Sequence, residues 1–330
     1  MDQNLLSTSE PTLYQLFLNS RKQNRLANAY LLYGPANAPL KETAVYLAES
    51  LSCEKSLFSC GSCPSCVRFA SGIHPDFVLI DGQFETIRKE DIQTLESKFA
   101  LSALEKGHRL AYVIHGMDNI TEEAANALLK FLEEPKEGQV AFLTTTNRTR
   151  VLKTIESRCL AVRVDPIDPD GYYQTLLETS FQVGKKPLTL PPTQAYLLSQ
   201  FTGSLEEAKA LVEGEYGFLD GTEAVEGFLN DLTTSVSQAS YALLLQTSQL
   251  KDLTCYNWLY LSLDEIYQDV LIGDVSDKNP FRDIIARLSS KKAGIKKAKQ
   301  IIDEAISLRQ VNLSPTLVLS RMLLALKDEA

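Results

Sequence analysis

The stretch that most constrains this chain is a junction near its N-terminus, AYLLYGPANAPLKET. The apolar run over residues 29–33 predicts a buried strand, and a helix is predicted from Pro39 to Leu51, with proline at its first position, where a missing N–H costs nothing. A strand, loop and helix in this order form the frame of a phosphate-binding loop, in which glycines let backbone N–H groups surround phosphates. Whether the loop keeps that chemistry decides what the fold can do.

The loop keeps the spacing of this pattern but loses its chemistry. The pattern G-x-x-x-x-G-K-[ST] begins at Gly34, but its second glycine is replaced by Pro39, which has no N–H to donate. The lysine and hydroxyl positions hold Leu40 and Lys41. Lys41 does not restore the site, because one step along a helix turns the side chain by roughly 100°. We predict a nucleotide-binding frame that no longer binds ATP productively.

Further apolar runs predict the rest of a sheet. Up to residue 164 they alternate with helical patterns, which is typical of a doubly wound, mainly parallel α/β sheet. Ligands of such sheets bind beyond the carboxyl ends of the strands. The predicted strands span residues 29–33, 77–80, 110–114, 140–144 and 160–164.

After Pro166 the predicted elements are helical. We expect a small helical unit over residues 168–212, interrupted by the loop 184–192, and only helices over residues 222–330. The predicted organisation is therefore an α/β domain, a small helical lid and an all-α C-terminal domain. Their bounds are 1–165, 166–212 and 213–330.

Charge and hydropathy exclude several classes of protein. The net charge of −9 argues against a chain whose overall field captures nucleic acid, while a local basic face stays open. The first residues show no basic segment before an apolar core, so we expect no signal peptide. No apolar run approaches the ~20 residues that cross a bilayer. We expect a cytoplasmic protein without a membrane partner.

Four cysteines lie close together in the pattern C-x6-C-x2-C-x2-C, at Cys53, Cys60, Cys63 and Cys66. Without an export signal, clustered cysteines indicate metal ligands rather than disulfides. Four thiolates close a tetrahedral shell, so we predict a structural Zn²⁺ in a module over 53–66, with four reduced thiols as the alternative. His74 is either an exchanged ligand or a capping or solvent-facing residue.

The end of the strand predicted at 110–114 lacks the acids of an ATPase. An active P-loop ATPase has an Asp there that helps to hold Mg²⁺ and a Glu that polarises the attacking water. This chain has His115 and Gly116, and imidazole is a poor ligand for Mg²⁺, which prefers oxygen. We expect Asp118 to cap the following turn. This second loss agrees with the loss at Gly34–Lys41.

Several motifs of the α/β region occur in a known combination, which resembles the delta-prime family of bacterial clamp-loader subunits within the AAA+ superfamily. The resemblance covers the α/β domain well, whereas the helical remainder matches only in architecture. The motifs are Gly34-Pro35, the four cysteines followed by His74-Pro75-Asp76, the run ANALLKFLEEP at 125–135, and Ser157-Arg158-Cys159.

The resemblance implies an AAA+ P-loop-type domain, a lid, and a C-terminal collar domain for oligomerisation. It also implies a non-hydrolysing subunit of the DNA polymerase III clamp loader that helps to load the sliding clamp onto primed DNA. The implied partners are gamma/tau and delta subunits, the clamp, and primed DNA within the complex. Zn²⁺ is the one cofactor expected, and ATP is not.

Individual residues acquire roles from the resemblance. Arg158 resembles an arginine finger supplied in trans, for which a guanidinium suits because it is always charged and forks across two oxygens. Taken alone, Arg158 is at least as readily a partner of a surface carboxylate. Asn147 is either a sensor 1-like residue or a strand-end cap. Glu206 stands where active subunits have the arginine of sensor 2, and a carboxylate there would repel a γ-phosphate.

Basic residues elsewhere have bland explanations. The lysines between Lys291 and Lys299 are either a solvated helix face or a binding patch. Lys98 and Arg109 are weak candidates for contacts with DNA phosphates.

Two other functions stay in view. One is an ATP-binding gamma/tau-like subunit or another AAA+ replication ATPase active on its own, which needs lysine at position 40 and acids at 115 and 116. The other is a zinc-dependent hydrolase or deaminase, which needs an open metal position and a glutamate base.

Overall fold

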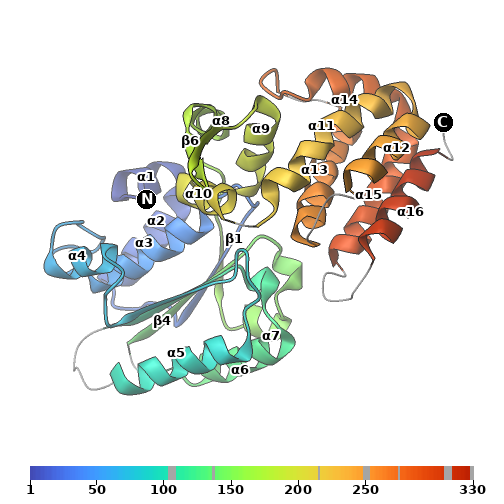
Figure 1. Cartoon of the computed structure of the whole chain (residues 1–330). Coiled ribbons are helices and arrows are strands. Elements are labelled where there is room, and N and C mark those ends of the chain that lie inside the picture. Colours follow the sequence, from blue (N-terminus) through green and yellow to red (C-terminus); the bar gives the residue numbers. More distant parts are fainter. Residues whose placement is uncertain are drawn as a thin grey trace. The chain divides into compact units, whose positions relative to one another are not determined.

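A computed structural model describes residues 1–102, 109–135, 138–214, 216–247, 253–273, 276–307 and 314–327. The chain divides into two compact units (Figure 1). The first consists of Met1–Ile167 with Thr202–Ser204, and the second of Asp168–Phe201 with Leu205–Ala330.

A five-stranded parallel sheet forms the centre of the first unit, in the order β2-β3-β4-β1-β5. Strands β3 and β4 are buried along their whole length, as expected of strands that are covered on both faces. The predicted parallel α/β sheet is thus confirmed. Its strands are β1 (Ala29–Tyr33), β2 (Phe77–Asp81), β3 (Leu110–His115), β4 (Gln139–Thr145) and β5 (Leu160–Arg163).

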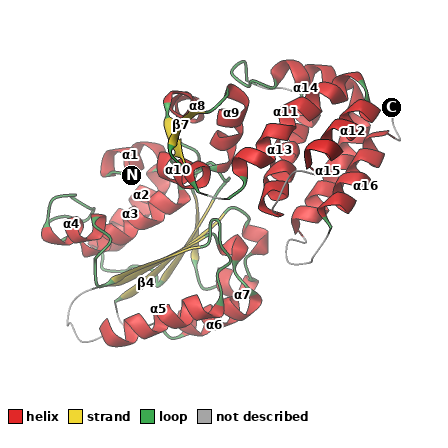
Figure 2. Cartoon of the chain, in the orientation of Figure 1, coloured by secondary structure: helices red, strands yellow, loops and turns green. Residues whose placement is uncertain are grey.

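Helices cover both faces of this sheet (Figure 2), each over its own apolar cluster. Alternate strand residues point to opposite faces, so Leu32 and Val113 belong to one cluster and Leu31 and Tyr112 to the other. The first cluster includes α1 (Gln3–Ser9), α2 (Pro11–Lys22), α3 (Leu40–Ser52) and α4 (Pro64–Ala70). The second includes α5 (Lys89–Ser102), α6 (Glu122–Glu133) and α7 (Lys153–Glu156).

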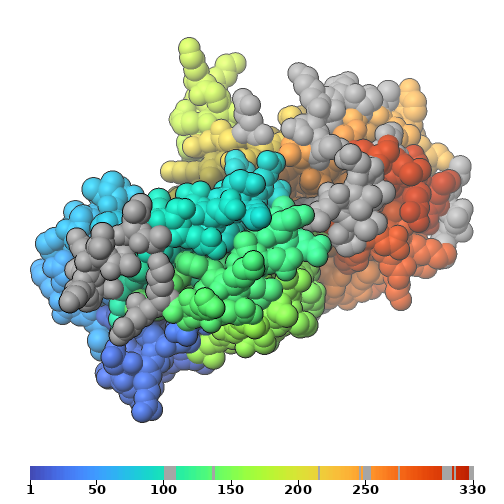
Figure 3. All heavy atoms as spheres, turned by 90° about the horizontal axis from the view of Figure 1, so that it is seen from below, coloured from blue at the N-terminus to red at the C-terminus, as the bar shows by residue number. Residues whose placement is uncertain are grey.

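Helix α6 forms where the sequence predicts it. Thr121 caps it by accepting a hydrogen bond from the N–H of Ala124 at 3.2 Å. The predicted apolar positions Ala124, Leu128 and Leu132 are buried. In the space-filling view of Figure 3, the cyan and green segments that contain α5 and α6 form one continuous surface. Two short 3₁₀ turns, η1 (Met117–Asn119) and η2 (Arg148–Arg150), follow β3 and β4.

The second unit begins with three helices and a β-hairpin, and the sequence did not predict the hairpin. Strands β6 (Ser180–Val183) and β7 (Lys186–Thr189) pair antiparallel where we expected only helices and a loop. Gly184, with φ +63°, supplies the left-handed residue of the turn. The strands have four residues each, too few for a clear period. The helices are α8 (Pro169–Glu178), α9 (Pro192–Phe201) and α10 (Leu205–Glu213).

The remainder of the second unit is helical where it is described, as predicted. It contains α11 (Phe218–Thr234), α12 (Val236–Thr247), α13 (Leu253–Ile272), α14 (Arg282–Leu288), η3 (Ser289–Lys291), α15 (Lys292–Ser307) and α16 (Pro315–Lys327). Among the described residues, no helix combines the length and the apolar character needed to span a bilayer. The two-unit division has a boundary after Ile167 and none near 212, so the three-domain organisation stays a prediction.

Candidate functional site: an altered nucleotide-binding frame and a four-cysteine cluster

The loop between β1 and α3 is closed by its own hydrogen bonds. A Cβ atom at Gly34 would lie 2.1 Å from the carbonyl oxygen of Val164, so only glycine fits there. The N–H of Gly34 donates to the carbonyl of the last β4 residue at 3.3 Å. The N–H groups of Ala38 and Leu40 donate to Pro35 and Ala38 at 3.0 and 2.7 Å. Three backbone donors of this loop are therefore already bonded within the chain.

The residues that follow this loop do not present the groups of a phosphate-binding site. Pro39 lies at the N-cap of α3, one position before the predicted one, and the helix begins at Leu40. Leu40 is 2% exposed and belongs to the apolar cluster of this face. The ammonium of Lys41 lies 2.8 Å from a carboxylate oxygen of Asp81, at the end of β2. Lys41, in the first turn of α3, is thus directed to the end of β2.

The end of β3 places an uncharged side chain in the frame. His115 is buried, and its Nδ1 lies 2.7 Å from the hydroxyl oxygen of Thr144. Burial lowers the pKa of His115 to about 4, so the imidazole is neutral at neutral pH. Gly116 has a φ of +76°, and a Cβ there would lie 2.8 Å from the backbone of Gly82. Neither residue supplies the carboxylate oxygen that Mg²⁺ requires.

Asp118 has a larger structural role than the turn cap that we expected. Its carboxylate accepts hydrogen bonds from the hydroxyl of Thr145 at 2.6 Å and from the N–H groups of Thr146 and Asn147 at 2.8 and 3.0 Å. It thereby fastens η1 to the end of β4. Asn147 caps η2, because its side-chain oxygen accepts the N–H of Thr149 at 3.1 Å. The cap interpretation of Asn147 matches this geometry, and a sensor role stays a prediction.

Arg158 follows α7 and is held by two neighbours. Its guanidinium lies 2.7 Å from a carboxylate oxygen of Glu133, the last residue of α6, and donates to the carbonyl of Thr154 at 2.7 Å. The arginine and glutamate side chains are 36% and 49% exposed. The ion pair that residue chemistry alone suggests is thus present in this chain. An exposed pair contributes about 0–1 kcal/mol, so releasing the guanidinium costs little.

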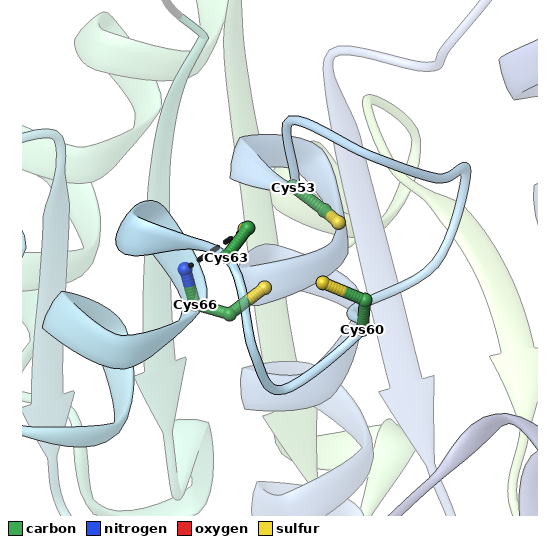
Figure 4. A group of neighbouring side chains, drawn as sticks. All are labelled: Cys53, Cys60, Cys63 and Cys66. Atoms are coloured by element: carbon green, nitrogen blue, oxygen red, sulfur yellow. Dashed lines mark hydrogen bonds between the residues drawn. The ribbon is translucent and has the colours of Figure 1, made fainter.

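The four predicted cysteines converge on one point (Figure 4). Cys53 caps the end of α3 and Cys63 the start of α4, and the N–H of Cys66 donates to the Cys63 sulfur at 3.4 Å. All four sulfur atoms, including that of Cys60, lie within 4.8 Å of one another. Tetrahedral Zn–S bonds of about 2.3 Å separate sulfurs by roughly 3.8 Å, so a small contraction fits this set to zinc.

The protonation of these thiols differs before metal binds. Hydrogen bonds from Ser62 lower the pKa of Cys60 to about 6, whereas burial raises the pKa of Cys66 to about 12. A metal binds thiolates, so Zn²⁺ would displace the proton of Cys66. Four sulfur ligands leave no open coordination position, and such a site supports structure rather than hydrolysis.

His74 fastens the cysteine module to the sheet instead of joining the sulfur cluster. It is buried, its Nδ1 accepts the N–H of Asp76 at 3.2 Å, and its Nε2 lies 3.0 Å from the hydroxyl of Ser65 in α4. The capping role that we considered for His74 is therefore observed, and the solvent-facing one is wrong.

The remaining basic candidates are tied to their own unit. Lys299 lies 2.5 Å from Asp264, and Lys292 donates to the carbonyl of Leu271 at 3.2 Å. These contacts favour the helix-face interpretation of the lysine run. Lys98 is exposed, Arg109 donates to Asn24, and Glu206 is exposed on α10. Contacts with DNA, and the loss of sensor 2 function at Glu206, stay predictions.

The cysteine cluster predicts one Zn²⁺ per chain. Cys63→Ser removes a ligand and should abolish zinc retention, which elemental analysis of the purified chain measures. Cys255→Ala is the control, because Cys255 is a buried cysteine outside the cluster and should leave the zinc content unchanged. Equal zinc content in both variants would contradict the site.

The buried imidazole predicts a dependence of stability on pH. The pKa of His115 is about 4 in the folded chain and 6.5 in its ordinary state, so the unfolded chain binds a proton first as the pH falls. Between pH 6.5 and 4 the free energy of unfolding should therefore fall, by up to about 1.4 kcal/mol per pH unit. Urea unfolding of the chain and of His115→Gln at pH 7.5 and 5.5 measures this, and identical pH dependence in both would contradict it.

Comparisons with known proteins find similarity to subunits of DNA polymerase III. Residues 9–168 match the family model described as DNA polymerase III, delta subunit. The chain is 36% identical over 203 residues to DNA polymerase III subunit delta′ of Bacillus subtilis, covering 61% of this chain and 59% of that protein. It is 35% identical over 147 residues to the Pseudomonas aeruginosa subunit delta′, covering 43% and 44%.

The chain is also 29% identical over 220 residues to DNA polymerase III subunit tau of Escherichia coli, covering 65% of this chain and 33% of that protein. The similarity therefore spans less than two thirds of the length of each of these relatives. It includes the segment that carries the altered nucleotide-binding frame, the cysteine cluster and Arg158. Through residues 9–168, this chain is similar to the DNA polymerase III delta-subunit family.

Proposed function

We propose that this chain is a non-hydrolysing subunit of the DNA polymerase III clamp loader. The observation that carries the proposal is the state of the nucleotide-binding frame. Leu40 lies in the core where a lysine would reach phosphates, and neutral His115 lies where an aspartate would help to hold Mg²⁺. A frame that has lost its cation and its metal ligand does not perform phosphoryl transfer.

The partners follow from the family. We infer that the chain assembles with gamma/tau and delta subunits in the cytoplasm, and helps to open the sliding clamp for loading onto primed DNA. The all-helical region from α11 to α16 would form its part of an oligomeric collar. The zinc of the cysteine cluster would be structural, since four thiolates exclude a reactive water.

Arg158 would act on the nucleotide of a neighbouring subunit. The guanidinium lies on a partly exposed side chain, and its pairing with Glu133 is weak enough to exchange for a phosphate. Charge-assisted, two-pronged hydrogen bonds to phosphate oxygens are stronger than one exposed ion pair. Arg158 would thereby stabilise the charge that develops during hydrolysis in the neighbour.

A second candidate function rests on the similarity to subunit tau: a gamma/tau-like chain that binds ATP itself. The two candidates differ in their requirement for this chain's own loop. A gamma/tau-like subunit would bind Mg–ATP between Gly34 and Lys41, whereas the proposed subunit would leave that loop without nucleotide.

Calorimetry of the purified full chain with Mg–ATP separates these candidates. We expect no saturable heat at micromolar nucleotide, because the loop donors are bonded internally and Leu40 is buried. A lysine-bearing clamp-loader subunit titrated in the same buffer is the positive control. Saturable binding to this chain would reject the non-hydrolysing assignment in favour of the gamma/tau-like one.

Replacement of Arg158 tests its action in trans. In the reconstituted loader, Arg158→Ala should lower the ATPase rate at the facing site by ~10³-fold, the lower range for an arginine finger. The steady-state ATPase of the complex measures this, and co-purification checks that the assembly is intact.

Two variants serve as controls for this measurement. Arg68→Ala removes another exposed arginine that lies 3.9 Å from a glutamate, and should leave the rate unchanged. Glu133→Ala frees Arg158 and should not lower the rate. A rate for Arg158→Ala equal to that of Arg68→Ala would remove the finger.

A further inference from the structure

We propose that the nucleotide-binding frame is closed from within, and that the Lys41–Asp81 ion pair takes the place of bound nucleotide in holding α3 to the sheet. The backbone at Gly203 completes the closure by covering the loop before α3. The inference deepens the proposed function and rests on it, since it concerns what occupies the frame when ATP does not.

The ion pair joins two elements that meet at the frame. Lys41 is in the first turn of α3, and Asp81 is the last residue of β2, an edge strand. Their charged atoms lie 2.8 Å apart, and the side chains are 16% and 36% exposed. Asp81 also accepts the N–H of Gln83 at 3.0 Å, which fixes the carboxylate. Because water screens a half-buried pair less than an exposed one, it joins α3 to β2 more strongly than a surface pair would.

The charge of Lys41 has a partner within the chain. Asp81 is opposite His115 in the β2–β3 register, and the histidine is neutral. The positive charge of Lys41 is therefore balanced by Asp81. Burial opposes the ionisation of Asp81, but the hydrogen bonds from Lys41 and from the N–H of Gln83, together with the charge of Lys41, outweigh it, and the pKa of Asp81 is lowered. An approaching phosphate would have to displace a carboxylate that Lys41 already binds.

The closure at Gly203 comes from a distant part of the sequence. Residues 202–204 cluster with the first unit, although the chain before and after them belongs to the second. A Cβ at Gly203 would lie 2.3 Å from the carbonyl oxygen of Ala38 and 2.8 Å from the Cα of Pro39. Both are backbone atoms, so no flexible side chain can yield. The backbone at Gly203 thus lies directly against the loop that would surround phosphates.

These contacts fix the frame in one arrangement. In a nucleotide-binding subunit, the bound ligand would join the loop, helix and strand ends. Here two residues of the chain itself form the ion pair that joins α3 to β2, so the join needs no ligand. The position of α3 should therefore be independent of nucleotide, which suits a subunit whose edge must serve a neighbour at every stage of its cycle.

A double-mutant cycle on the full chain tests the ion pair. The variants are Lys41→Met, Asp81→Asn and the combination, and the readout is amide hydrogen exchange over residues 34–43. Each single change should speed exchange about tenfold, because it leaves an unpaired charge in a half-buried place. The combination should speed exchange by clearly less than the product of the singles, since neither charge is then left alone.

Two further variants complete the test. Arg163→Met breaks another pair of the same length, 2.8 Å, whose side chains are 64% and 57% exposed, and should leave exchange over 34–43 unchanged. Gly203→Ala should speed exchange over the same residues by displacing the loop. Additive singles, or a Gly203→Ala variant that exchanges like Arg163→Met, would overturn the inference. Mg–ATP calorimetry of the unmodified chain reports separately on the proposed function, so the two failures are distinguishable.

Discussion

The close approach of Gly34 to Val164 is the constraint on which the rest of the first unit depends. A Cβ atom at Gly34 would lie 2.1 Å from a backbone oxygen, so only glycine allows this close approach. The loop that starts at Gly34 leads into α3, and both ends of α3 contact other parts of the first unit. Its first turn carries Lys41, which is bound to β2, and its C-cap is Cys53, a member of the sulfur cluster. A helix of 13 residues, about 20 Å long, therefore connects the loop after β1 with the four-cysteine cluster.

Local patterns predicted the parts of this structure that depend on local chemistry. The five strands of the sheet, helix α6 with its cap, and the convergence of four cysteines all follow from apolar runs, capping residues and ligand spacing. The β6–β7 hairpin was missed because four-residue strands carry too little periodicity. The hydrogen-bond partners of Asp118 and the carboxylate partner of Arg158 lie 25 to 29 residues away in sequence. The Lys41–Asp81 pair joins elements whose adjacency only the strand order reveals. Such pairings depend on topology, which a single sequence does not specify.

In the proposed function, the work of an ATP site would be divided between two chains. A complete site needs a loop, a metal ligand and a stabilising cation, and Arg158 would supply the cation to the neighbour. The loop and the metal ligand are altered at two separate places in the sequence, at Leu40 and at His115. Both substitutions support the proposal of a non-hydrolysing subunit, and zinc would stiffen the cysteine module at the end of α3.

The pairing of Arg158 with Glu133 would affect how Arg158 binds the nucleotide of a neighbouring subunit. A guanidinium that moves to a triphosphate leaves its carboxylate behind, and that carboxylate then stands close to a dense negative charge. Binding of Arg158 to the triphosphate would thus place the free Glu133 carboxylate near the phosphates, and the two negative groups would repel each other. Once the terminal phosphate departs, Arg158 would pair with Glu133 again. Added salt would weaken both this repulsion and the attraction between Arg158 and the phosphates. Glu133 would thereby favour rapid dissociation of Arg158 from the neighbour's nucleotide.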